Sequence, residues 1–172
     1  TWTSEGWLEL YKNELDPDFL NKEYDREMWQ KINKVPDQVI WELRNRQREK
    51  LISYVKERIK VAMAKRLEPP RIMMESEEKF DGNNLTIGFA RRFATYKRAG
   101  LIFSDLDRLA KIVNHPERPI QFIFAGKAHP RDKAGQELIK MIVEMTRKPQ
   151  FIGRIIFLQN YDMSLAQKLV QG

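Results

Sequence analysis

Cysteine is absent from the 172-residue sequence, and histidine occurs only twice. Without cysteine the chain has neither a disulfide scaffold nor a zinc site built on thiolates. His115 and His129 have no carboxylates at a spacing that suits a metal, so we predict no metal site. No apolar run approaches the roughly 20 residues that span a bilayer, and no signal segment opens the sequence. These absences predict a cytoplasmic protein that does not bind a membrane.

Glycine and proline are also scarce, with 8 of each, which excludes a fibrous or low-complexity chain. Hydrophobic residues make up 42%, too many for a disordered chain. Residues 1–80 hold 16 Lys+Arg and 16 Asp+Glu, whereas residues 81–172 hold 15 and 8. The whole net charge of +7 therefore lies in the second half. It points to an anionic partner there, although a solvated basic surface would give the same count.

Residues 1–80 have the pattern of a helical segment. Pro36 and Asp37 suit the first turn of a helix, where a missing N–H costs nothing and a carboxylate favours the dipole. No Gly or Pro follows until Pro69, and apolar residues recur at helical steps, which predicts a rod of roughly 45 Å. We expect the acidic stretch at 75–78 to be a solvated connector. The tryptophans expected to pack this helical layer are Trp2, Trp7, Trp29 and Trp41.

After residue 80 the period shortens. The apolar runs expected to be strands span residues 85–90, 120–125 and 155–158. The helical patterns between and after them span about 104–115, about 133–146 and residues from 163 onward. This alternation predicts a right-handed parallel α/β sheet. Three strands are few for such a sheet, so we expect residues 81–172 to be an incomplete Rossmann-like domain of a larger protein.

Cations gather where an open parallel sheet binds ligands, beyond the carboxyl end of a strand. The first strand is followed by RRFATYKR, with four cations in eight residues. Arg91 and Arg92 at the strand end and Lys97 at an expected helix start are placed to converge on one anion. Forked guanidinium donors, a compact ammonium and helix N–H groups suit a phosphate. The alternative is a surface loop whose cations face water.

Two further loops leave the same predicted edge. In the second, Gly126 would let the backbone approach a ligand, and Lys127 and His129 would point into the cleft. In the third, Asn160 and Tyr161 would hydrogen-bond a polar ligand, unless Tyr161 only caps the edge of the core. The sequence contains no Walker A motif and no G-x-G-x-x-G.

The motifs R-R-x-x-x-Y-K-R, A-G-K-A-x-P and F-L-x-N-Y-x-x-S-L-A are specific in combination. They lie in the runs LTIGFARRFATYKRAGLIFSDLDRLAKIVN, IQFIFAGKAHPRDKAGQELIKMI and RIIFLQNYDMSLAQKLVQG. With these runs the chain resembles the glycogen/α-glucan (maltodextrin) phosphorylase family, especially its shorter bacterial and archaeal members. The opening TWTSEGWLELY resembles the segment after that family's N-terminal domain, so the resemblance covers essentially the whole chain.

The resemblance implies a GT-B glycosyltransferase fold with two Rossmann-like halves. Residues 1–80 would be a helical segment linking the halves, and residues 81–172 the first part of the C-terminal half. The family cleaves α-1,4-glucans with inorganic phosphate to give glucose 1-phosphate, and its cofactor is pyridoxal phosphate, which acts through its 5′-phosphate. The family's cofactor lysine would lie beyond Gly172. We therefore expect this fragment to hold no pyridoxal phosphate and to be inactive alone.

The resemblance also assigns roles position by position. Arg92 resembles the arginine that binds substrate phosphate, and Lys97 resembles the lysine close to both phosphates, so these two are the expected catalytic residues. Arg91 stands where many members have a lysine that contacts the cofactor phosphate, and Tyr161 resembles a tyrosine that hydrogen-bonds it. Arg91, Lys97 and Tyr161 are thus the expected cofactor-binding residues. Asp162 stands where animal enzymes have an arginine, so no role is carried over to it.

Two other functions remain open. A nucleotide-sugar glycogen or starch synthase of the same fold class also places an Arg and a Lys after the first strand of its second domain, but the other two motifs fit it poorly. A nucleic-acid-binding module would use the basic half, yet the sequence lacks the aromatic–basic interleaving of single-strand platforms. The implied partners are inorganic phosphate, α-1,4-glucan and the remainder of the parent chain. The exposed strand edge of an incomplete sheet would also favour self-association into a homo-oligomer.

Overall fold

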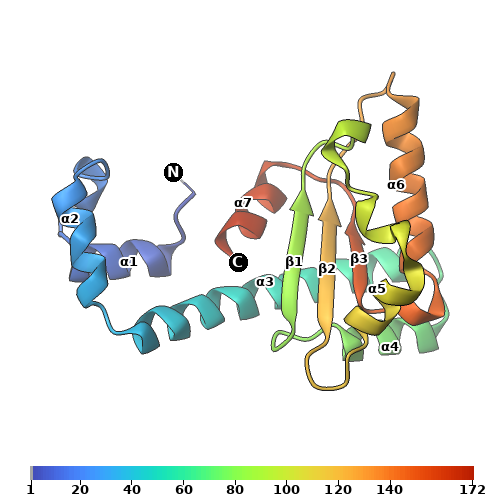
Figure 1. The fold of residues 1–172 in the computed structure, drawn as a ribbon, viewed down its shortest axis with the longest axis horizontal. Helices are drawn as coiled ribbons and strands as arrows, with labels where there is room; N and C mark the ends of the chain where they lie inside the picture. The colour runs from blue at the N-terminus through green and yellow to red at the C-terminus, as the bar shows by residue number, and fades with distance from the viewer. Residues whose placement is uncertain (1) are drawn as a thin grey trace.

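In the computed structural model, which describes residues 2–172, a three-stranded parallel sheet carries helices on both faces and a helical arm projects to one side (Figure 1). The helices are α1 (Glu5–Glu14), α2 (Arg26–Gln30), α3 (Asp37–Lys65), α4 (Pro70–Lys79), α5 (Leu106–Val113), α6 (Lys133–Thr146) and α7 (Met163–Gln171). The strands are β1 (Leu85–Ala90), β2 (Ile120–Ala125) and β3 (Ile155–Leu158). This architecture confirms the predicted α/β class with a partial Rossmann-like sheet and one long helix before it.

The strands lie in the order β1-β2-β3, and both neighbouring pairs are parallel. Ala90 is level with Ala125, and Ala125 with Leu158, so the three strands end along one line. The three strand ranges agree with those expected from the apolar runs. Short apolar runs separated by capped helices leave few other arrangements, because parallel strands need a crossover between them.

Two apolar cores lie on opposite faces of the sheet. Alternate side chains of a strand point to opposite faces. Ile123 and Ile156 therefore pack against α3 and α7, whereas Phe124 and Ile155 pack against α5 and α6. β1 is less well covered, since Leu85 remains 60% exposed and the strand has a neighbour on one side only among residues 2–172.

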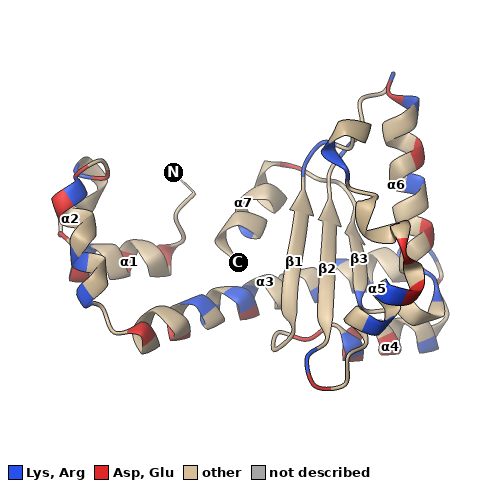
Figure 2. Ribbon diagram, viewed as in Figure 1, with Lys and Arg blue, Asp and Glu red and all other residues tan. Residues whose placement is uncertain are grey.

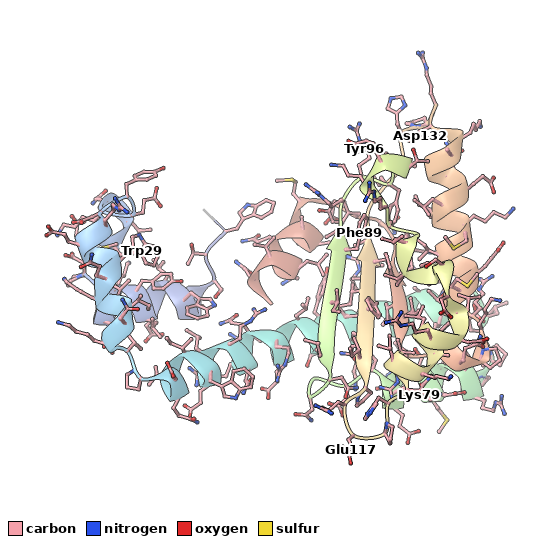
Figure 3. All side chains as sticks on the ribbon, viewed as in Figure 1. Trp29, Lys79, Phe89, Tyr96, Glu117 and Asp132 are labelled. Carbon is pink, nitrogen blue, oxygen red and sulfur yellow. The ribbon has the colours of Figure 1, made fainter. Side chains whose placement is uncertain are left out.

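The helical arm consists of α1, α2 and the first turns of α3, and it has small cores of its own. Trp29, labelled in Figure 3, packs edge-on against Tyr11 at 5.2 Å and Phe19 at 5.4 Å between ring centroids. Two of the four tryptophans do not pack as expected. Trp41 is 57% exposed and Trp2 40% exposed. Trp41 lies near the start of α3, and the guanidinium of Arg48 lies 5.9 Å from its ring centroid.

A further helix replaces the solvated connector expected at residues 75–78. Pro69 and Pro70 end α3, but Pro70 is also the first residue of α4, where its missing N–H is tolerated. The acidic residues lie on this helix, and the carboxylate of Glu75 pairs with the ammonium of Lys79 one turn later at 2.6 Å. Ser76 is buried on the same helix. None of the helices in residues 2–172 has the length and apolar content needed to cross a membrane.

Candidate functional site

Three loops meet at the edge where the strands end. Figure 3 shows Tyr96 and Asp132 at this edge, while Lys79 and Glu117 lie at the opposite end of the sheet. Figure 2 shows a run of basic residues directly after β1. The edge therefore has the place and the charge that were expected of a ligand site.

Main-chain hydrogen bonds continue past the end of β1 and fix the basic loop. The N–H of Arg91 donates to the carbonyl of Ala125 at 3.1 Å, and the N–H of Phe93 donates to the carbonyl of Lys127 at 2.9 Å. The first two loops are thus joined at the backbone beyond the ends of the strands themselves. Arg91 and Arg92 lie within this joined stretch, so their Cα positions are set by the sheet.

Phe93 anchors the loop in the core. Its side chain is fully buried, with its ring centroid 5.4 Å from that of Phe89 and 5.8 Å from that of Phe157. Ala99 is also buried. The basic segment is therefore held down on both sides of Lys97, while the charged side chains stay on the surface. This role of Phe93 was not predicted, and its signal in the sequence was the more apolar of two aromatic residues, Phe93 and Tyr96, between two groups of cations.

Two glycines allow the loops to approach so closely. A Cβ at Gly126 would overlap the carbonyl oxygen of Arg91, and a Cβ at Gly135 would come 2.5 Å from the carbonyl oxygen of Phe93. We expected Gly126 to let the backbone approach a ligand. In the structure the group that fills this space is instead the main chain of the basic loop, so Gly126 positions Arg91.

The cations of this loop have no acidic partner. Within residues 2–172, no carboxylate lies within 4.0 Å of the charged groups of Arg91, Arg92 or Lys97. Arg91 and Arg92 are exposed, whereas Lys97 is half-buried with its Nζ 4.9 Å from the ring centroid of Tyr96. An ammonium over a ring face remains positively charged and keeps donors for an anion.

The segment around Lys97 is a different structure from the one expected. Thr95–Lys97 is a single 3-10 turn, and the next α-helix begins only at Leu106. Arg98 ends the turn because its backbone is left-handed, with φ of 57°. Helix N–H groups therefore do not contribute beside Lys97, and binding there depends on the side chains. A left-handed arginine is a strained position of the kind found at functional sites.

The second loop is held by its own backbone rather than aimed at a ligand. His129 is exposed, and its Nδ1 accepts a hydrogen bond from the N–H of Arg131 at 3.1 Å. Lys127 is exposed and takes part through its carbonyl, as described above. Asp132 caps α6 by accepting from the N–H of Gly135 at 2.9 Å. The structure thus gives His129 a turn-forming role and leaves the ammonium of Lys127 at the edge.

The third loop brings Tyr161 to the same core as the end of β1. Tyr161 is half-buried and packs, like Ala90, against the core between the sheet, α3 and α7. The preceding Asn160 is left-handed, with φ of 55°, a conformation that asparagine tolerates. Asp162 caps α7, since its carboxylate accepts from the N–H of Leu165 at 2.8 Å. The carboxylate of Asp162 lies at this basic edge because it is hydrogen-bonded to the N-terminus of α7.

The arrangement as a whole can bind an anion without first breaking an ion pair. Guanidinium and ammonium groups are the donors that phosphate binds best in proteins. No group of three His, Asp or Glu side chains suited to a metal ion is found in the part of the chain that the structure describes. The chemistry that this edge offers is therefore that of cationic donors rather than of metal ligands.

The chain is similar to glycogen and maltodextrin phosphorylases along most or all of its length. It is 41% identical to glycogen phosphorylase of Aquifex aeolicus over all 172 residues and covers 25% of that protein. It is 45% identical to maltodextrin phosphorylase of Thermococcus litoralis over 146 residues, which are 84% of the chain and 17% of that protein. It is 38% identical to glycogen phosphorylase of Mycobacterium tuberculosis over 172 residues, 20% of that protein.

No family model matches the chain. The chain spans between 17% and 25% of the length of these curated relatives, so it corresponds to a segment of such proteins. The similarities confirm the family resemblance that the three motifs indicated.

Proposed function

We propose that this chain, which matches a segment of the glycogen and maltodextrin phosphorylase family along its whole length, supplies part of the phosphate site of an α-1,4-glucan phosphorylase. Such an enzyme cleaves α-1,4-glucans with inorganic phosphate and releases glucose 1-phosphate. One observation carries the proposal. The basic loop is pinned by Phe93 and Gly126, yet Arg91, Arg92 and Lys97 carry no ion pair within residues 2–172.

In this proposal Arg92 and Lys97 hold the substrate phosphate. The forked guanidinium of Arg92 orients two phosphate oxygens, and Lys97 adds a compact positive charge near them. The backbone at Arg92 is held by the hydrogen bonds that continue β1, and the backbone at Lys97 lies between the buried Phe93 and Ala99, so little backbone ordering is needed when phosphate binds. They also stabilise negative charge on the phosphate as a proton moves between it and the glycosidic oxygen.

Pyridoxal phosphate is the cofactor proposed for the intact enzyme, where it supplies a second phosphate group close to the first. Arg91, Lys97 and Tyr161 are the residues that would hold it: within residues 2–172 neither cation has a carboxylate within 4.0 Å, and Tyr161 packs against the same core as Ala90. Two unit charges of like sign 5 Å apart repel by about 3 kcal/mol at an effective dielectric constant of 20. Arg91, Arg92 and Lys97 together offset that repulsion.

Phosphate binding by the chain itself tests the loop. We expect a titration followed by ³¹P NMR to show saturable phosphate binding that weakens with added NaCl. Arg92→Gln and Lys97→Met should each weaken it at least about fivefold, the loss of roughly 1 kcal/mol. Arg118→Gln, an exposed arginine before β2 at the other end of the sheet, is the matched control and should bind as the parent chain does. Equal binding by all four proteins would refute the assignment.

The catalytic part of the proposal has a separate test. Because the chain corresponds to a segment of its relatives, we expect it to release no glucose 1-phosphate from maltodextrin and phosphate. Within a full-length relative carrying this segment, Lys97→Met should reduce turnover by several orders of magnitude. Near-normal turnover in that variant would remove Lys97 from the catalytic residues even if phosphate still binds.

A further inference from the structure

A deep groove runs along the open edge of β3, away from the basic loop. Its volume is about 450 Å³. It extends from Gly153 at one end of the strand to Asn160 at the other, so it is as long as β3 itself. The C-terminal half of α3 and helix α4 form one wall, and the end of α6 forms the opposite wall. Apolar side chains in the walls are Val61, Ala62, Ile72 and Val143.

The floor of the groove is a strand edge with unpaired main-chain groups. Within residues 2–172, β3 has a single neighbouring strand, β2. The N–H of Phe122 donates to the carbonyl of Arg154 at 2.8 Å. This bond identifies which residues of β3 turn their main-chain groups toward β2. In a parallel ladder alternate residues turn their main-chain groups toward a given neighbour. Ile156 therefore faces β2, whereas Ile155 and Phe157 direct their N–H and C=O groups into the groove.

An unsatisfied buried hydroxyl lies at one end of the groove. The Oγ of Ser76 is buried and has no hydrogen-bond partner among the residues that the structure describes. The serine is 2% exposed and lies beside Gly153, where an added Cβ would come 3.1 Å from the Cα of Ser76. Buried hydroxyls normally have a partner. The groove thus contains a hydroxyl that can hydrogen-bond to a ligand.

The groove is basic at the end where β3 begins, whereas the end where β3 stops holds one cation and one carboxylate, Arg58 and Glu57. Arg58 lies at the carboxyl end of β3, where its guanidinium donates to the carbonyl of Gln159 at 2.8 Å. At the other end, Arg66 and Arg147 each lie 3.5 Å from the same carboxylate of Glu68. Two cations sharing one carboxylate leave an excess of positive charge at that end. The groove therefore favours a ligand with negative charge at the end where β3 begins.

We propose that this groove binds an extended acidic peptide, which adds to β3 as a fourth strand. Unpaired main-chain groups along a strand edge are the recognition surface of strand addition. Four residues of strand span about 13 Å, the length of the floor. Both faces of the added strand would meet a helix, so its central residues are apolar on both sides, as in other covered parallel sheets. An acidic residue at one end of that centre meets Arg66 and Arg147 where β3 begins.

A synthetic peptide with this pattern tests the proposal. We would use fluorescein-labelled EVIVVE amide, which presents an acidic residue to the basic end in either strand direction, and measure its anisotropy as the 172-residue chain is added. Saturable binding is expected below about 1 mM chain. Two further peptides then test whether main-chain amides of the peptide bind β3. One is N-methylated at residues 2 and 4, and the other at residues 3 and 5. One should lose affinity at least about tenfold and the other should change less than about threefold, because only alternate amides face β3.

Protein variants test the place of binding. Arg147→Glu should weaken the peptide about threefold to tenfold, while Arg118→Glu, at an exposed site outside the groove, should not. Hydrogen exchange of the Phe157 amide should slow when the peptide is bound. The proposal is overturned if the peptide does not bind, if both methylated peptides behave alike, or if Phe157 exchanges at an unchanged rate. The comparison of the methylated peptides and the exchange of the Phe157 amide are both measured on the parent chain, so neither depends on whether a variant folds.

Discussion

Gly126 faces the carbonyl oxygen of Arg91 across the first two loops, at a distance that leaves no room for a side chain on residue 126. The contact follows from the continued ladder in which the Arg91 N–H bonds the carbonyl of Ala125. One backbone position in the second loop therefore determines where the arginines of the first loop lie. Their placement depends on packing as well as on their own sequence.

Gly126→Ala should disturb both stability and phosphate binding. The added methyl group has to displace the main chain at Arg91, because its nearest neighbours are the carbonyl group of Arg91 and Cε2 of the buried Phe93 ring. We expect the free energy of unfolding to fall by about 1–3 kcal/mol and phosphate affinity to fall with it. Urea denaturation and a phosphate titration measure the two effects.

Gly88→Ala is the matched control in β1. A Cβ at Gly88 would meet no atom within 4 Å among residues 2–172. Alanine is preferred over glycine in a strand by roughly 0.5–1 kcal/mol. The variant should therefore be as stable as the parent chain or slightly more so. If Gly88→Ala and Gly126→Ala destabilise equally, the close contact at Arg91 is not the cause.

Phe93→Ala should release the basic loop from the core. The side chain is fully buried against Phe89 and Phe157, so its removal leaves a cavity and should lower the free energy of unfolding by about 3–5 kcal/mol. Tyr96→Ala in the same loop removes a ring that is 68% exposed, and we expect a change within about 0.5 kcal/mol. Thermal unfolding of the two variants side by side measures the contrast, and similar losses would contradict the anchoring role.

Much of this fold follows from local patterns in the sequence. The three strands and the helices after them are each marked by an apolar run or by a capping aspartate such as Asp105. The shape of the basic loop is not marked in this way, because Thr95–Lys97 and the left-handed Arg98 depend on contacts with Phe93 and α6. Trp41 was misplaced for a similar reason, since an aromatic residue on a helix gives no sign of which face has a neighbour.

Gln121→Leu should weaken the start of β1. The buried amide of Gln121 accepts from the N–H of Asp81 at 3.1 Å and donates to the carbonyl of Asp81 and to the Oγ1 of Thr86, both at 2.8 Å. Leucine would remove all three bonds and leave the half-buried N–H of Asp81 without its partner, at about 1–3 kcal/mol if water does not reach it. Gln136→Leu, at a loop-bonding glutamine on α6, is the control. Urea unfolding should separate the two, and equal midpoints would show that water replaces the amide.

The pair of Asp16 and Lys22 in the helical arm should make stability depend on pH at the acidic end. The hydrogen bond from the Lys22 ammonium, 2.8 Å long, lowers the pKa of Asp16 below its usual range, and the same bond raises the pKa of Lys22. A lowered carboxyl pKa gives stability that is present above the unfolded pKa and lost as the pH falls through the folded one. Lys22→Met removes the bond, so the urea midpoints of parent and variant should differ at pH 7 and converge near pH 2. Because the pair is exposed, added salt should also reduce the difference at pH 7. A difference that persists unchanged in acid would mean that Lys22 stabilises the arm through its hydrocarbon chain.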